Sequence, residues 1–150
     1  MISVIQRVSS CAVKINGQPY SAIGPGLLVL LGVRTNDSDA DAVLLAEKIV
    51  NLRIFEDGDG KMNRSLLDTG GQLMVVSQFT LCADCRQGRR PSFTGAAEPE
   101  LGARLYNLFI DQARAKGVTV ATGQFGAKML VEISNDGPVT LTLDTSFSLK

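Results

Sequence analysis

The sequence predicts an α/β fold whose mixed β-sheets form two layers, in a barrel-like arrangement, with two long helices packed on one side. Two apolar runs, residues 27–33 and 73–79, are typical of strands buried on both faces. Two further segments, about 40–52 and 99–115, repeat apolar residues at helical spacing. At Ser9-Ser10 the apolar positions of the first strand change phase, which indicates a bulge or corner between the two β-layers. Strands mixed with separate helices favour such layered packing.

Shorter elements follow from local signals along the chain. The even-numbered residues from 2 to 8 share one face of the first strand, and Asn16-Gly17 then predicts a hairpin returning along residues 20–23. A short strand is predicted at 53–55. From residue 118 onward the chain is predicted as strands, the last two runs separated by a Gly-Pro pair.

Both helices carry start signals. Residues 36–39 supply N-cap side chains and negative charge before the first helix. Pro99 suits the first turn of the second helix, and Gly117 ends it. The inner face of this helix is predicted to hold Leu101, Leu105, Leu108 and Phe109.

Length and composition bound the class of protein. A chain of 150 residues is expected to form a single domain over 1–150, which buries roughly 70% of its surface on folding. The formal charge is zero, which argues against a strongly basic nucleic-acid module but allows a local basic patch. No signal peptide is evident, and the run 27–31 is far too short to cross a membrane. The expected location is the cytoplasm, where an odd number of cysteines is also typical.

The chain contains no histidine, so it lacks the commonest general base and the commonest metal ligand. A Ser-His-Asp triad is therefore excluded. Cys82 and Cys85 form a C-x-x-C, but Cys11 is the only other thiol, and a structural zinc needs more ligands. We expect free thiols, no metal and no cofactor. Residues 57–60 suggest a calcium loop, but Lys61 occupies a ligand position, so a turn is predicted.

Two polar segments stand out. The first, Ser77-Gln78-Phe79-Thr80-Leu81, follows a buried strand, where α/β proteins often bind ligands. Considered alone, it is better explained by Ser77 and Thr80 satisfying local backbone groups, because a nucleophile needs a base within reach. The second is Asn135-Asp136-Gly137-Pro138-Val139-Thr140. It places a glycine, whose backbone has unusual conformational freedom, directly before a proline, whose φ is fixed and which has no N–H. Such a turn can hold main-chain carbonyls in a fixed direction.

Taken together, these two segments resemble the motif pair of the D-aminoacyl-tRNA deacylases, also known as D-Tyr-tRNA deacylases. Both motifs occur in the order and at the separation typical of that family, and the likeness extends over nearly the whole chain. It includes Gln6-Arg7-Val8, residues 26–33, Arg53-Ile54-Phe55, Lys61-Met62-Asn63, Arg90-Pro91-Ser92-Phe93 and the region around Phe125. The C-x-x-C departs from the family pattern.

The resemblance implies a homodimeric enzyme that hydrolyses the ester joining a D-amino acid to the terminal adenosine of tRNA. The Gly137-Pro138 peptide would be cis and would enter the active site of the partner subunit, where its carbonyls capture the substrate α-amino group. An L side chain would collide with this backbone, whereas a D side chain would point to solvent. Glycine would not be excluded, so glycyl-tRNA mischarged on tRNA-Ala is an expected second substrate.

The resemblance also assigns roles to side chains. The catalytic segment would be Ser77, Gln78, Phe79 and Thr80, whose main-chain N–H groups at 78–80 would stabilise an oxyanion. Since Thr80 has no evident base, hydrolysis assisted by the ribose 2′-hydroxyl ranks above covalent catalysis by Thr80.

Substrate binding is assigned to Gly137, Pro138 and Arg7, with the Arg7 guanidinium bracing the turn by donating to carbonyls. Three arginines, Arg86, Arg89 and Arg90, would contact phosphates near the acceptor end of the tRNA.

Two alternatives stay open at this stage. One is a non-catalytic RNA-binding module that uses the same three arginines. The other is a hydrolase that uses Thr80 on another ester or amide.

Overall fold

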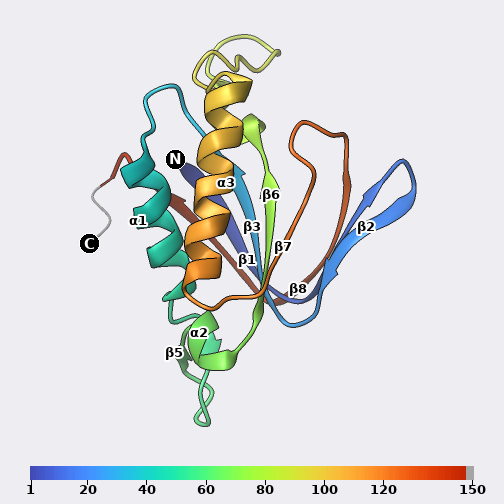
Figure 1. Cartoon of the computed structure of the whole chain (residues 1–150), viewed down its shortest axis with the longest axis vertical. Coiled ribbons are helices and arrows are strands. Elements are labelled where there is room, and N and C mark those ends of the chain that lie inside the picture. Colours follow the sequence, from blue (N-terminus) through green and yellow to red (C-terminus); the bar gives the residue numbers. More distant parts are fainter. Residues whose placement is uncertain (148–150) are drawn as a thin grey trace.

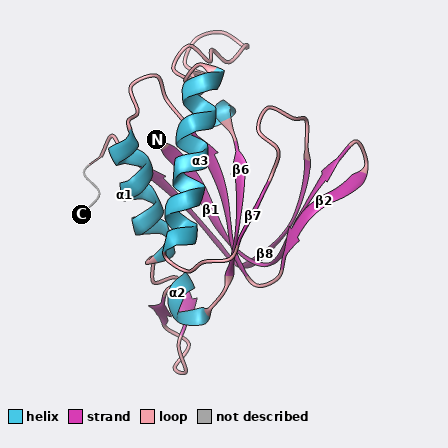
Figure 2. Cartoon of the chain, viewed as in Figure 1, coloured by secondary structure: helices cyan, strands magenta, loops and turns pink. Residues whose placement is uncertain are grey.

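The computed structural model describes residues 1–147 and confirms the α/β class. Six strands form one mixed sheet in the order β2-β1-β3-β6-β7, with β8 paired to the other edge of β1. The pairs β3–β6 and β6–β7 are parallel, and β1 is antiparallel to its three neighbours. Helices α1 and α3 cover one side of the sheet, and the halves of β1 and β8 near β2 curl away from them, so that the sheet nearly closes into a barrel (Figures 1 and 2).

The strands are β1 (Ile2–Ile15), β2 (Gln18–Ile23), β3 (Gly26–Gly32), β4 (Phe55–Glu56), β5 (Met62–Arg64), β6 (Gln72–Ser77), β7 (Val120–Thr122) and β8 (Leu130–Asp144). The helices are α1 (Asp39–Val50), the short α2 (Leu66–Thr69), the 3₁₀ helix η1 (Phe79–Cys82) and α3 (Pro99–Ala115). None of the helices in the described part of the chain is long and apolar enough to cross a membrane.

The central strands β3 and β6 are buried on both faces, as their apolar runs predict. One face, with Leu27 and Val75, contributes to the main core beneath α1 and α3. The opposite face, with Leu28 and Met74, contributes to a second core inside the curled part of the sheet. Alternate residues therefore belong to different cores, because successive side chains of a strand point to opposite faces.

Strand β1 joins the two cores, and its phase change is confirmed. The odd-numbered Ile5 and Arg7 are buried on the helix side of the sheet. Beyond them, Val8, Cys11 and Val13 lie in the second core. The even-numbered residues from 2 to 6 are only half-buried, so the face that the pattern grouped together is not the main core face. The register with β8 shifts between Val8 and Ser10, which is the predicted bulge, and also between Gln6 and Val8, where residues 136–139 lie opposite Arg7.

Several predicted boundaries shift. The first helix ends at Val50 rather than Leu52, and the short strand predicted at 53–55 is Phe55–Glu56. Strand β7 is shorter than the predicted 118–122, whereas α3 has the predicted bounds. The strands expected on either side of Gly137-Pro138 form one strand, β8, because the segments before and after this pair both bond to β1. The predicted turn at 57–60 is confirmed: Asp57 accepts from the N–H groups of Asp59 and Lys61.

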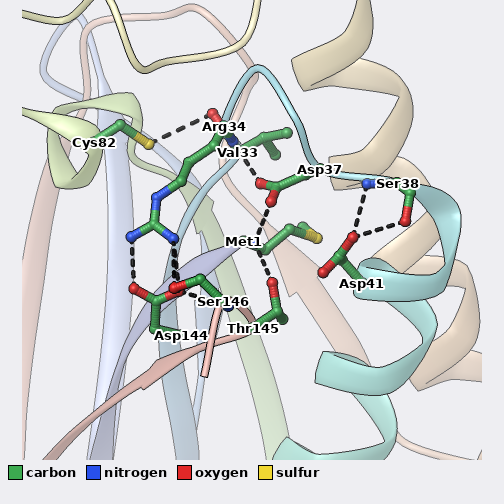
Figure 3. A network of polar contacts seen from close by, with 10 residues as sticks. All are labelled: Met1, Val33, Arg34, Asp37, Ser38, Asp41, Cys82, Asp144, Thr145 and Ser146. Atoms are coloured by element: carbon green, nitrogen blue, oxygen red, sulfur yellow. Dashed lines mark hydrogen bonds and ion pairs between the residues drawn. The ribbon is translucent and has the colours of Figure 1, made fainter. Parts of the chain in front are cut away.

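A polar network ties the end of β8 to the loop after β3 (Figure 3). The Arg34 guanidinium donates to both carboxylate oxygens of Asp144, at 2.6 Å each. The Met1 ammonium donates to Asp37 Oδ1 and Thr145 Oγ1, at 2.5 Å each, and Asp37 also accepts the Arg34 main-chain N–H. The hydrogen bond from Arg34 holds the pKa of Asp144 well below its usual range.

This pKa depression predicts acid sensitivity. A carboxylate whose pKa is lowered by folding stabilises the protein fully above its ordinary pKa, near 4, and loses that contribution as the pH falls through the lower folded pKa. We expect Asp144→Asn to cost about 1–2 kcal/mol of unfolding free energy at neutral pH and to flatten the decline between about pH 4 and 2. Urea titrations across this range measure both effects. Asp111→Asn, at an exposed ion pair of 3.8 Å, is the control. An Asp144→Asn pH slope equal to that of the wild type would refute the assignment.

Candidate active site

A cavity of about 490 Å³ opens where β6 ends. It is bounded by the end of β6 and the start of η1, by the chain before α3 and by the segment leading into β8. The described lining residues are Val76, Ser77, Gln78, Phe79, Ala96, Ala97, Pro99, Phe125, Gly126, Ala127, Met129 and Val131. None of these side chains is acidic, basic or a thiol. The polar groups offered to a ligand are therefore Ser77, Gln78 and main-chain atoms.

The segment 77–80 lies at this cavity, although Thr80 is not among the lining residues. The Gln78 side-chain amide donates to Thr80 Oγ1, so the hydroxyl oxygen is engaged as an acceptor. An oxygen that receives a hydrogen bond is a weaker nucleophile, and none of the described residues is placed as a base for its proton. The geometry therefore gives Thr80 no activation.

The main-chain N–H groups of this segment are not equivalent. The Gln78 N–H donates to the Leu31 carbonyl at 2.8 Å, which removes it from the expected set of three oxyanion donors. The N–H groups of Phe79 and Thr80 have no acceptor within residues 1–147. The predicted set is thus reduced to these two donors, because the first is needed to join β6 to β3.

A basic loop adjoins the cavity through an aromatic contact. Phe93 packs edge-on against Phe79, with 5.1 Å between ring centroids. Main-chain hydrogen bonds between Asp84 and Ser92, at 2.8 and 2.9 Å, close the loop that lies between them.

The three arginines of this loop differ in their engagement. Arg86 is paired with Asp84 through two hydrogen bonds, at 2.9 and 2.6 Å. Arg89 and Arg90 are exposed, and their side chains make no ion pair with any residue that the structure describes. The charge available to a polyanion is therefore mainly that of Arg89 and Arg90.

The Gly137-Pro138 peptide is cis, as the resemblance implies. In the β1–β8 ladder Gln6 pairs with Thr140 and Val8 pairs with Asn135, so residues 136–139 protrude opposite Arg7 alone. We call residues 136–139 the Gly-Pro turn. Gly137 has φ +116°, and a Cβ there would lie 2.9 Å from Val139 Cγ2 and 3.0 Å from Arg7 Nη2. A glycine is thus required by both conformation and space.

Arg7 lies against this turn, but not through the carbonyls of the turn. It is 5% exposed, and its Nη1 donates to the Ile54 carbonyl at 2.8 Å. Its Nε lies 3.1 Å from Asp136 Oδ2, an ion pair whose angle does not make a hydrogen bond. Nη2 lies 3.7 Å from Glu56. The resemblance implies that the Arg7 guanidinium donates to the carbonyls of Gly137 or Pro138. Instead it donates to the Ile54 carbonyl and contacts the turn through the charge of Asp136.

The cavity and the Gly-Pro turn do not meet within one chain. Arg7, Gly137 and Pro138 are absent from the described lining of the cavity. The sequence motifs are thus brought to two separate places.

Sequence reasoning missed one residue at the turn. The Asn135 side chain donates to the Arg7 carbonyl at 2.9 Å and to the Val139 carbonyl at 3.0 Å. Its position directly before the turn could have identified it, because asparagine commonly hydrogen-bonds to nearby backbone at turns.

The cysteines are free thiols, as expected. Cys82 Sγ lies 3.5 Å from the Val33 carbonyl, beside the Arg34 network (Figure 3). Cys85 is exposed, Cys82 is half-buried, and Cys11 is buried in the second core. Burial raises the pKa of Cys82 and raises that of Cys11 to about 11.

This order of exposure predicts the order of alkylation. At pH 8 iodoacetamide should modify Cys85 first, Cys82 more slowly and Cys11 last, because the thiolate is the reactive form and burial disfavours it. Mass spectrometry of peptides over time measures the order, with protein in denaturant as the control in which all three react alike. Labelling of Cys11 in the folded protein as fast as Cys85 would contradict the prediction.

The structure is an α/β protein with a cavity whose described lining offers neutral polar side chains and main-chain groups to a ligand. A family model described as D-Tyr-tRNA(Tyr) deacylase matches residues 4–144. The D-aminoacyl-tRNA deacylase of Dehalococcoides mccartyi strain 195 is 60% identical over 97% of this chain and 95% of its own length. That of Clostridioides difficile is 57% identical over 99% of both chains. The chain belongs to the D-aminoacyl-tRNA deacylase family and is an enzyme, a hydrolase.

Solved structures support the fold. The structure of a protein named "c-Myc DNA Unwinding Element Binding Protein" has a TM-score of 0.90 and 40% identity, covering 96% of this chain and 98% of its own. A probable eukaryotic D-amino acid tRNA deacylase superposes with a TM-score of 0.83 at 19% identity, over 95% of this chain and 97% of its own.

Proposed function

We propose that the enzyme hydrolyses the ester of D-aminoacyl-tRNA, and of glycyl-tRNA mischarged on tRNA-Ala, releasing the free amino acid and tRNA. The observation that carries the mechanism is the cavity lining, in which none of the described residues has an ionisable side chain. Binding and orientation are then the contributions of the protein, and these supply up to about 7–11 kcal/mol in favourable cases. A substrate of translation implies action in the cytoplasm.

The chemical step is assigned to the substrate RNA. Thr80 is engaged by Gln78 and lacks a base, whereas the terminal ribose carries a 2′-hydroxyl next to the scissile ester. That hydroxyl orients or activates the attacking water. The free N–H groups of Phe79 and Thr80 are the protein donors available to the oxyanion that forms.

Chirality is set by the Gly-Pro turn of a second subunit. The turn and the cavity are separate within one chain, and the exposed apolar side chains of β8, Leu130, Ile133 and Leu141, suit a homodimer contact. In the dimer the Gly137-Pro138 carbonyls hold the α-amino group of the substrate. An L side chain would then strike the backbone of the turn, a D side chain would point outward, and glycine would pass.

The RNA chain is held by the loop closed at Asp84 and Ser92. Arg89 and Arg90 are free to bind phosphates close to the cavity, with Arg86 joining them if it exchanges Asp84 for phosphate.

The chiral assignment predicts a large preference for one enantiomer. The wild type should hydrolyse D-Tyr-tRNA faster than L-Tyr-tRNA in kcat/KM by on the order of 10²-fold or more. Gly137→Ala should reduce this preference sharply, because the added methyl forces the turn away from Arg7 and Val139. Gly17→Ala, another glycine with positive φ but open space around it, is the matched control. Equal rates for both enantiomers in the wild type would refute the proposal.

The chemical assignment predicts that the RNA matters more than Thr80. A D-Tyr-tRNA ending in 2′-deoxyadenosine should be hydrolysed about 10²–10⁴-fold more slowly in single turnover. Thr80→Val, which keeps the shape and removes the hydroxyl, should retain most of the rate on normal tRNA. A trapped acyl ester on Thr80, or an unchanged rate on the deoxy substrate, would favour the alternative Thr80-dependent hydrolase.

One observation favours a second function beside hydrolysis, the binding of nucleic acid in its own right. A protein of similar solved structure, at 40% identity, is named for binding a DNA unwinding element. Binding of DNA or uncharged tRNA as tight as that of charged tRNA would select this candidate.

A further inference from the structure

The Gly-Pro turn interrupts the β1–β8 ladder, and one side chain replaces the missing hydrogen bonds. Arg7 has no pairing partner on β8, because residues 136–139 protrude opposite it. Its carbonyl nevertheless accepts a hydrogen bond of 2.9 Å from Asn135 Nδ2. Without this donor the partly buried carbonyl would lose its hydrogen bond on this edge of β1. Asn135 therefore closes the ladder at the base of the turn.

The same amide nitrogen also holds the far end of the turn. Asn135 Nδ2 donates to the Val139 carbonyl at 3.0 Å, and the Val139 side chain is buried in the main core. One amide group thus joins β1, the residue before the turn and the last residue of the turn. The separation between the two ends of the Gly-Pro turn is fixed by these two hydrogen bonds.

The orientation of the amide is fixed in turn. Thr140 Oγ1 donates to Asn135 Oδ1 at 3.3 Å and accepts from Gln6 Nε2 at 3.2 Å. With its oxygen engaged by Thr140, the amide must point its NH₂ group at the two carbonyls.

We infer that Asn135 is a positioning residue for stereospecificity: it fixes the direction in which the Gly-Pro turn presents its carbonyls, and so the enantiomer that the enzyme accepts. The inference rests on the proposed function. The guanidinium of Arg7 holds the start of the turn by charge at Asp136, but no contact of Arg7 reaches the Val139 carbonyl. Without the amide, the second half of the turn can swing, and an L side chain gains room.

The test compares both enantiomers in one set of variants. Asn135→Ala should lower the D-over-L ratio of kcat/KM at least tenfold, mainly by raising hydrolysis of L-Tyr-tRNA relative to D-Tyr-tRNA. Asn51→Ala is the matched control, because Asn51 also donates its amide to a carbonyl, that of Glu47, on α1. The Asn51 variant should keep the wild-type ratio.

A ratio in Asn135→Ala equal to that of the wild type, with both rates reduced alike, would overturn the inference and leave the proposed function intact. Absence of any D-over-L preference in the wild type would instead overturn the proposed function itself. The two failures are therefore distinguishable.

A second pair of variants applies if Asn135→Ala does not fold. Thr140→Val removes the hydroxyl that orients the amide while keeping the side-chain shape, and Thr140→Ser restores it. The inference expects a reduced D-over-L ratio in the valine variant and recovery in the serine variant. Equal ratios in the two variants would overturn it.

Discussion

Strand β1 forms hydrogen bonds on both of its edges. At Arg7 one of these edges is interrupted, and this interruption fixes where the Gly-Pro turn leaves the sheet. Pairing with β3 continues through Arg7. Pairing with β8 skips Arg7 on β1 and residues 136–139 on β8, and then resumes. The last residue of the turn, Val139, packs its side chain in the main core, and the first, Asp136, pairs with the guanidinium of Arg7. The turn is therefore an exposed piece of main chain on a rigid base. The recognition of substrate by shape that we propose for this turn requires such a rigid support.

The cavity at the end of β6 follows from the same sheet. Because β3 and β6 are parallel and buried on both faces, β6 ends where the chain must leave the core, and η1 begins there. The hydrogen bond from Gln78 to Leu31 fixes the point of departure. Phe79 and Thr80 then expose N–H groups that no strand uses. The donors proposed for the oxyanion are in this sense the unpaired end of a ladder.

The parts of the fold that depend on periodicity could be predicted from the sequence, and those that depend on distant partners could not. The apolar runs of β3 and β6 and the helical spacing of α3 each lie within one segment, so their signals are local. The face of β1 that enters the main core was not predictable, since it is chosen by contacts with β3 and the helices. The contacts of Arg7 with Ile54 and Glu56 likewise join residues far apart in the sequence. The role of Asn135 depends on a ladder register that only the folded chain defines.

The neutral lining of the cavity has a consequence for how the enzyme responds to its surroundings. A catalyst that relies on a histidine or a carboxylate changes its activity when that group gains or loses a proton. Here the described walls of the cavity contain nothing that titrates, so an acid or alkaline limb in the rate would have to arise outside the cavity lining. The walls of the cavity therefore keep the same charge as the surrounding acidity changes.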